Sequence, residues 1–200
     1  MLKEKFETLC RNFSKNEELI DELWEEIETE HSKKTRHYHT LQHLENIYRE
    51  LEKVKITALL EFTIFYHDIV YDASRNDNEE ESAKLCKQRL LQLNLPMKLI
   101  KEITQLINET RTHKTSSQTN ALFLDADLAI LGSSNYEQYT KNVRQEYSVY
   151  DDATYLTGRK KVLKMFLDKK RIYMSKYFYE QYENKARKNL EQELRTLCSL

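Results

Sequence analysis

The chain has 200 residues, with 32 basic and 33 acidic side chains but only two glycines and one proline. Sandwiches and barrels need many turn residues, so this shortage of glycine and proline argues against them and favours a helical fold. A net charge of −1 provides no basic field for a nucleic-acid polymer, and no stretch has the roughly 18 apolar residues of a membrane span.

Helices are predicted at the start of the chain and again after a polar break. Apolar residues recur at helical spacing over residues 2–11, and again downstream of Ser14-Lys-Asn-Glu17, which has the pattern of a capping box. The polar stretch His31–Arg36 interrupts this pattern, and the next helix is expected to begin near His39 or Thr40. In all, we expect about eight or nine helices in one domain that spans residues 1–200.

The most apolar segment of the chain follows. Residues 56–71 are apolar on nearly every side, with a single charge, Glu61, ahead of the histidine and aspartate near the end. A helix of this kind, here about sixteen residues long, is typical of the centre of a bundle. A polar loop is expected over Asp72–Asn78, then a helix over roughly 79–92, and Pro96 is placed to open another.

The remaining third of the chain also predicts helices. Residues 111–120 form a polar loop, and residues 121–131 form a short buried helix that Gly132 ends. Ser134-Asn-Tyr-Glu137 has the pattern of a second capping box. Three amphipathic helices are expected over residues 135–200.

Histidines and acids are concentrated in three of the apolar stretches and in the polar loop before the last of them. These residues are His39 and His43, His67 and Asp68, His113, and Asp125 and Asp127. Each taken alone is more simply a hydrogen-bonded core or surface residue. A carboxylate buried without a partner is costly, however, and one divalent cation would satisfy neutral imidazoles and ionised carboxylates together. The combination therefore predicts a metal site.

Helical spacing orders some of these candidates. His39 and His43 are four residues apart, so on a helix both would project from one face. Asp125 and Asp127 would lie about 200° apart on a helix, so only one of them is expected to bind a given ion.

The cysteines and glycines bear on other classes of site. Cys10, Cys86 and Cys198 form no C-x-x-C pair, so we expect a reducing, cytoplasmic environment rather than disulfides or a zinc knuckle. Gly132 and Gly158 begin no glycine-rich motif, which excludes a phosphate-binding loop of that kind.

Motifs along nearly the whole chain resemble the HD (His-Asp) superfamily of metal-dependent phosphohydrolases. The general ones are RHYHTLQH at 36–43, FYHDIVYD at 65–72, NDNEEESA at 76–83 and FLDADLAILG at 123–132. The tail is similar to a branch of predicted metal-dependent HD phosphohydrolases, through VRQEY at 143–147, GRKKVL at 158–163, RIY at 171–173 and ENKARKNL at 183–190. The resemblance implies an all-α, HD-type helical bundle with a metal site.

The resemblance also implies roles by position. His67 and Asp68 match the defining pair, and Ala126-Asp127-Leu128 matches the phrase that carries the last ligand. The first histidine of the family could be His39 or His43. Because Y-H-x-x-x-H resembles the cyclic-nucleotide phosphodiesterases of the superfamily, the second histidine is assigned to the metal and the first to the leaving oxygen. The implied ligands of one divalent ion (Mn, Fe, Ni, Zn or Mg) are His43, His67, Asp68 and Asp127, with His39 as proton donor.

Further positions follow from the same resemblance. Asp125 is then expected to brace a group next to the ligands. Asn78 stands where dinuclear members often carry a histidine, which favours one metal, although His113 could supply part of a second site. Glu79 either orients the metal-bound water or simply begins a helix, where an acid is favourable. Basic residues near the motifs are candidates to hold a phosphate, although each alone is more simply a solvated surface residue: Arg36, Arg75, Arg111, Lys114 and Arg144. His113 is a further candidate on the substrate side.

The implied activity is hydrolysis of a small phosphoester, such as a nucleotide, by attack of a metal-bound water, with Asp68 available to accept a proton. One alternative is a catalytically silent HD-fold module that binds or senses a nucleotide. Another is a di-iron HD oxygenase, which Asn78 disfavours. The expected partner is a small phosphorylated substrate, with no nucleic-acid polymer and no membrane, and the oligomeric state is left open.

Overall fold

The computed structural model describes residues 1–54, 56–115 and 117–199. In this part of the chain there are ten α-helices, one 3-10 helix and no strand, which confirms the all-α class. The predicted number of helices, eight or nine, was too low. The separate helical segments predicted along the chain already add up to ten. Within the described residues, no helix combines the length and the apolar character that crossing a bilayer requires.

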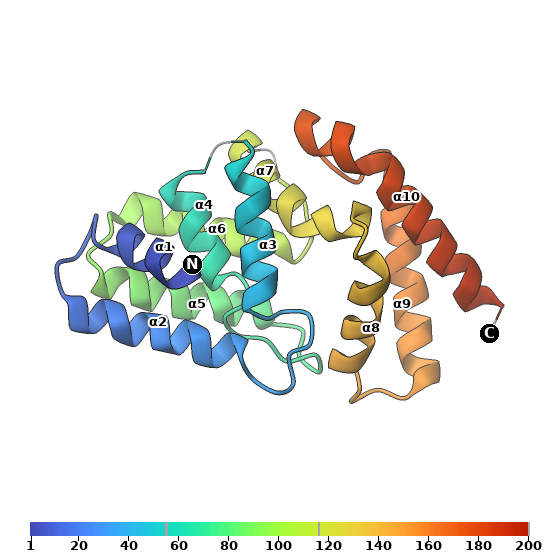
Figure 1. The fold of residues 1–200 in the computed structure, drawn as a ribbon, viewed down its shortest axis with the longest axis horizontal. Coiled ribbons are helices and arrows are strands. Elements are labelled where there is room, and N and C mark those ends of the chain that lie inside the picture. Colours follow the sequence, from blue (N-terminus) through green and yellow to red (C-terminus); the bar gives the residue numbers. More distant parts are fainter. Residues whose placement is uncertain (55, 116, 200) are drawn as a thin grey trace. The chain divides into compact units, whose positions relative to one another are not determined.

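The chain divides into two compact units, Met1–Thr115 and Ser116–Leu200 (Figure 1). The first unit contains α1 (Leu2–Cys10), α2 (Glu17–His31), α3 (Leu41–Glu52), α4 (Ala58–Tyr66), α5 (Asn78–Gln92) and α6 (Met97–Thr110). The second contains α7 (Gln118–Asp127), η1 (Leu128–Gly132), α8 (Tyr136–Glu146), α9 (Asp152–Leu167) and α10 (Lys176–Cys198). Whether each unit folds alone is a separate question, so the single domain over residues 1–200 stays a prediction.

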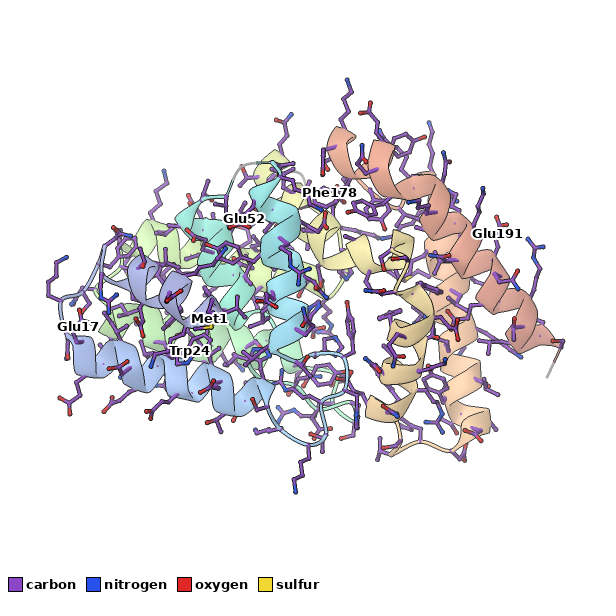
Figure 2. All side chains as sticks on the ribbon, in the orientation of Figure 1. Met1, Glu17, Trp24, Glu52, Phe178 and Glu191 are labelled. Carbon is purple, nitrogen blue, oxygen red and sulfur yellow. The ribbon has the colours of Figure 1, made fainter. Side chains whose placement is uncertain are left out.

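Helix α4 lies at the centre of the first unit, packed against α1, α3, α5 and α6. Its neighbours contribute aromatic rings: Phe6 on α1 meets Phe65 edge-on at 5.0 Å, and Trp24 on α2, labelled in Figure 2, also contacts Phe65. Large apolar side chains that leave water on every side of α4 stabilise the unit by roughly 1.5–3 kcal/mol each. The prediction of a central buried helix is therefore confirmed.

The length predicted for this helix was wrong. It ends at Tyr66, with His67 as its C-cap, so residues 67–71 leave the helix although they continue the apolar run. The backbone of this segment bonds to side chains from elsewhere instead of extending the helical ladder. Val70 exchanges two hydrogen bonds of 3.1 Å with the Ser82 hydroxyl. Asp72 does the same with the Asn78 amide, at 3.1 and 2.8 Å.

Neither predicted capping box is present. Helix α2 is capped by Asn16, whose Oδ1 accepts a 3.1 Å hydrogen bond from the Leu19 amide, while Ser14 accepts from the Asn16 amide at 3.2 Å. Helix α8 follows Asn135 without a side-chain cap. A box pattern predicts that a helix begins nearby, but several polar residues compete to be its cap.

In the second unit, the predicted helix over residues 121–131 is divided into α7 and η1. Its end at Gly132 is confirmed, but this glycine has no positive φ. A Cβ atom there would lie 2.8 Å from the backbone oxygen of Tyr182 on α10. Glycine is needed because α10 passes close to the backbone, and not because the helix ends in a left-handed turn.

Candidate metal centre

The described residues contain one group of His, Cys, Asp and Glu side chains with the arrangement of a metal site: His43, His67 and Asp68. One ligand atom from each lies within 4.8 Å of the others. His43 sits in the first turn of α3, and His67 and Asp68 follow the end of α4. Both imidazoles are buried, at 2% and 1% exposure, whereas the Asp68 side chain is 15% exposed. The group is therefore set into the first unit, and Asp68 is its most exposed member.

The ligand atoms are close to one another. His67 Nε2 lies 3.1 Å from Asp68 Oδ2, and His43 Nε2 lies 3.7 Å from the same oxygen. The two Nε2 atoms are 3.2 Å apart. His67 Nδ1 is 3.0 Å from the Ile64 carbonyl oxygen, which can only accept a hydrogen bond. The proton of a neutral His67 is therefore on Nδ1, and its Nε2 presents a lone pair to the group.

These distances fit a bound cation. Ligand atoms about 2.1 Å from one ion are about 3.0 Å apart at right angles and about 3.4 Å apart at the tetrahedral angle. The separations of 3.1 and 3.2 Å lie between these two values, and that of 3.7 Å corresponds to a somewhat wider angle at the ion. Two imidazoles and one carboxylate are ligands of Mn, Fe, Ni and Zn, and the set does not select among them. Facing lone pairs and a carboxylate repel one another unless a proton or a cation lies among them.

The charge of Asp68 also suits a cation site. Burial by itself raises the pKa of this carboxyl, but the neighbouring imidazoles of His67, His39 and His43 outweigh burial and hold the pKa well below its usual range. The group is therefore ionised at neutral pH and has the charge that a divalent ion requires.

His39 lies beside this group but on a different element from the one expected. It precedes Thr40, the N-cap of α3, so the premise that His39 and His43 share a helical face was wrong. Its Nε2 is nevertheless 3.8 Å from Asp68 Oδ2, and its side chain is 20% exposed. Its ring lies 4.1 Å from that of Tyr71. His39 is not among the three grouped ligands, and it is more exposed than His43 and His67.

The residues that fix the ligand segment include two that the sequence analysis did not single out for this purpose. Ser82 is buried and holds Val70, and Asn78 holds Asp72. The two are four residues apart on α5, so both face the segment that follows Asp68. The four-residue spacing of Asn78 and Ser82 within NDNEEESA places both on one face of a helix. The sequence does not show that this face contacts the segment after Asp68, so their role could not be predicted.

The two acids near the end of α7 differ in their surroundings. Asp125 is fully buried, and its oxygens accept hydrogen bonds of 2.9 and 2.7 Å from the amides of Met174 and Ser175, at the start of α10. Burial raises the pKa of Asp125, against the hydrogen bonds from Ser175 and Met174 and the charge of Arg171. Asp127 is the half-buried last residue of α7. It belongs to the second unit, and its role as a ligand stays a prediction.

The expected substrate-binding arginines are each engaged within the protein. Arg36 is buried and donates to backbone carbonyls, including those of His39 and Asp68. Arg75 pairs with Asp77 at 2.7 Å in the loop before α5. Arg144 pairs with Asp152 at 2.6 Å and lines a cleft of about 1070 Å³ within the second unit.

Two further candidates lie outside the group of three ligands. Glu79 is in the first turn of α5, where an acid favours the helix N-terminus. His113 follows α6 with a φ of 47°. Their catalytic and substrate-binding roles stay predictions. No protein-family model, no curated protein and no solved structure matches the chain, so the assignment of a function depends on the geometry around His43, His67 and Asp68.

Proposed function

We propose that this chain is an HD-type, metal-dependent phosphoric-ester hydrolase that acts on a small phosphorylated molecule such as a nucleotide. The observation that carries the proposal is the buried group of His43, His67 and Asp68, whose ligand atoms lie within 4.8 Å of one another. The order of its residues along the chain matches the order of the motifs that resemble the HD superfamily. One ion per chain is proposed, because Asn78 has no imidazole to offer and its amide bonds the Asp72 backbone.

Each side chain of the site has a separate role in this proposal. His43 and His67 would hold the cation through Nε2, and Asp68 would contribute the negative charge, with Asp127 as a further ligand. A divalent ion, when bound, polarises a phosphoryl group and lowers the pKa of water. His39, which is more exposed than His43 and His67, would hold a proton for the oxygen that leaves the phosphorus. Asp68 would accept the proton that the attacking water loses.

The experiment that tests the proposal begins with elemental analysis of protein purified without added metal. The protein is then loaded with Mn, Fe, Ni, Zn or Mg and assayed on a panel of nucleotides and other small phosphoesters. Asp68→Asn should abolish both bound metal and hydrolysis. Asp72→Asn is the matched control, because the Asp72 carboxylate bonds Ser74 and is exposed, and it should retain both.

The outcomes separate the alternatives. Nucleotide binding in calorimetry without hydrolysis under any of these metals would replace the enzyme with a nucleotide-binding module. Two ions per chain would contradict the single-metal proposal and favour the di-iron oxygenase. Unchanged metal content in Asp68→Asn would show that Asp68 is not a ligand.

A further inference from the structure

Arg36 lies next to the candidate metal centre, and its guanidinium forms hydrogen bonds to two separate backbone segments. The residue is 5% exposed. Its Nη1 donates hydrogen bonds to the carbonyl oxygens of His39, at 3.1 Å, and Asp68, at 2.6 Å. Its Nη2 donates to the Ile69 carbonyl at 2.9 Å. One planar group thus connects the backbone that carries His39 to the backbone that carries Asp68.

His31 also contacts the guanidinium of Arg36. It is the last residue of α2 and is buried, and its Nδ1 lies 3.1 Å from Arg36 Nη1. The same Nδ1 lies 3.3 Å from the His39 carbonyl oxygen, so a neutral imidazole accepts from Arg36 in one tautomer and donates to that carbonyl in the other. The end of α2 is therefore connected through Arg36 to both segments of the metal centre.

The hydrogen bonds of Arg36 to His39, Asp68 and Ile69 all go to backbone carbonyl oxygens. Buried backbone carbonyls outside a helix need donors, and the rigid fork of an arginine fixes several of them at once. A lysine has one flexible charge and cannot reproduce this geometry.

We infer that Arg36, supported by His31, is a positioning residue of the metal centre: it sets where His39 and Asp68 stand relative to each other. The contact with substrate expected of Arg36 from the sequence stays a separate prediction. The inference rests on the proposed function for the identity of the bound group as a metal. Its first test uses Co²⁺ as the probe, because visible absorption reports the ligand geometry around this ion.

Arg36→Gln removes the fork while keeping a polar side chain. We expect its affinity for Co²⁺ to fall by about 10–100-fold, the usual effect of losing a residue that orients a metal ligand, with a changed absorption spectrum. Arg36→Lys should show the same changes, since it restores the charge but not the fork. The matched control is Arg89→Gln, because Arg89 forms a two-bond pair with Glu26, at 2.6 and 2.8 Å, in the same unit. The control should lose stability but keep the affinity and spectrum for Co²⁺.

The result that overturns the inference is wild-type affinity and spectrum in Arg36→Gln, whether or not the variant is less stable. Should Arg36→Gln not fold, Arg36→Lys and His31→Ala carry the test, and wild-type Co²⁺ binding in both would overturn it. His31→Ala leaves the guanidinium in place, so a smaller change in the same direction is expected there.

A second measurement needs no metal and separates this inference from the proposed function. Amide hydrogen exchange in metal-free protein should be faster in Arg36→Gln over residues 67–72 and at Thr40, and unchanged there in Arg89→Gln. If wild-type protein binds no Co²⁺, the metal-dependent function fails, and the exchange pattern still decides whether Arg36 holds these segments. Unchanged exchange in Arg36→Gln would refute the positioning role even in a protein that binds Co²⁺.

Discussion

His39 differs from His43 and His67 in its access to solvent. The side chain is 20% exposed and lies 3.8 Å from Asp68, whereas the other two imidazoles are buried. A residue that donates a proton to a substrate must be reachable from outside and must not be held by the ion. The surroundings of His39 meet the first condition and place it beside the Asp68 carboxylate.

The proton-donor role predicts a separation of metal content from activity. His39→Ala should keep bound metal and lower kcat by roughly 10²–10⁴-fold, the usual loss for a missing general acid. The loss should be smaller for an aryl phosphate, whose leaving group needs no proton. His43→Ala is the comparison and should lose metal and hydrolysis together. If His39→Ala also loses its metal, His39 is a ligand and the donor assignment is wrong.

His31 predicts a dependence of stability on pH. Burial and the charge of Arg36 lower the pKa of His31 to about 3, whereas a histidine of the unfolded chain titrates near pH 6.5, roughly. The unfolded chain therefore takes up a proton that the folded chain does not. The contribution of His31 to stability is complete above about pH 6.5 and is lost as the pH falls toward about 3.

The measurement compares metal-free wild type with His31→Gln by urea unfolding at several pH values between about 7 and 4. Over this range, the wild-type free energy of unfolding should fall more steeply than that of the variant, by up to about 1.4 kcal/mol per pH unit. The carboxylates of the chain contribute to both curves and cancel in the difference. Parallel curves would show that His31 does not titrate as its burial implies.

Among the elements, the segment after α4 shows how side chains replace a helical ladder. Ser82 satisfies both the amide and the carbonyl of Val70, each at 3.1 Å. Arg36 and Asn78 hold the residues on either side. The irregular backbone is thus fixed at several points. Because Asp68 lies in this segment, the same hydrogen bonds restrict where its side chain can lie.

Removing the Ser82 hydroxyl should therefore destabilise the first unit. Ser82→Ala leaves two backbone groups of Val70 without this partner, at a cost of about 1–3 kcal/mol in the free energy of unfolding. Thr104→Ala is the matched control, because the Thr104 hydroxyl bonds only backbone of its own helix, at 2.9 and 3.1 Å, and should change stability by about 0.5 kcal/mol or less. Urea unfolding measures both. Equal effects of the two substitutions would contradict the role given to Ser82.

The same segment explains what the sequence could and could not predict. Apolar spacing located most of the helices, because burial on one side of a helix leaves a periodic trace. It extended α4 too far, because the apolar run resumes at Ile69, Val70 and Tyr71 without being helical. Partners that lie far along the chain, such as Arg36 and Ser82, leave no local pattern. His43, His67 and Asp68 were among the candidates because ionisable groups in apolar surroundings are costly unless they share a partner, and the resemblance to the HD superfamily then selected them as ligands.

Across the whole molecule, the tail motifs of the resemblance hold one another in the second unit. Glu183 accepts hydrogen bonds from the amides of Ile172 and Tyr173, at 3.0 and 3.2 Å. Arg187 donates to Glu183 at 2.7 Å. Thus ENKARKNL on α10 fixes the RIY segment that precedes it. These hydrogen bonds give the two motifs a structural role in the second unit and add nothing about a substrate.

Asp125 and Asp127 provide the last prediction, because the resemblance assigns only one of them to the metal. Asp125→Asn replaces an acceptor of the Met174 or Ser175 amide with a donor, so it should lower the free energy of unfolding by about 1–3 kcal/mol and leave Co²⁺ affinity unchanged. Asp127→Asn should do the reverse, weakening Co²⁺ binding in calorimetry with little effect on urea unfolding in the absence of metal. Co²⁺ binding that is weakened by Asp125→Asn and not by Asp127→Asn would exchange the two assignments. Binding that neither substitution changes would limit the ligands from this protein to His43, His67 and Asp68.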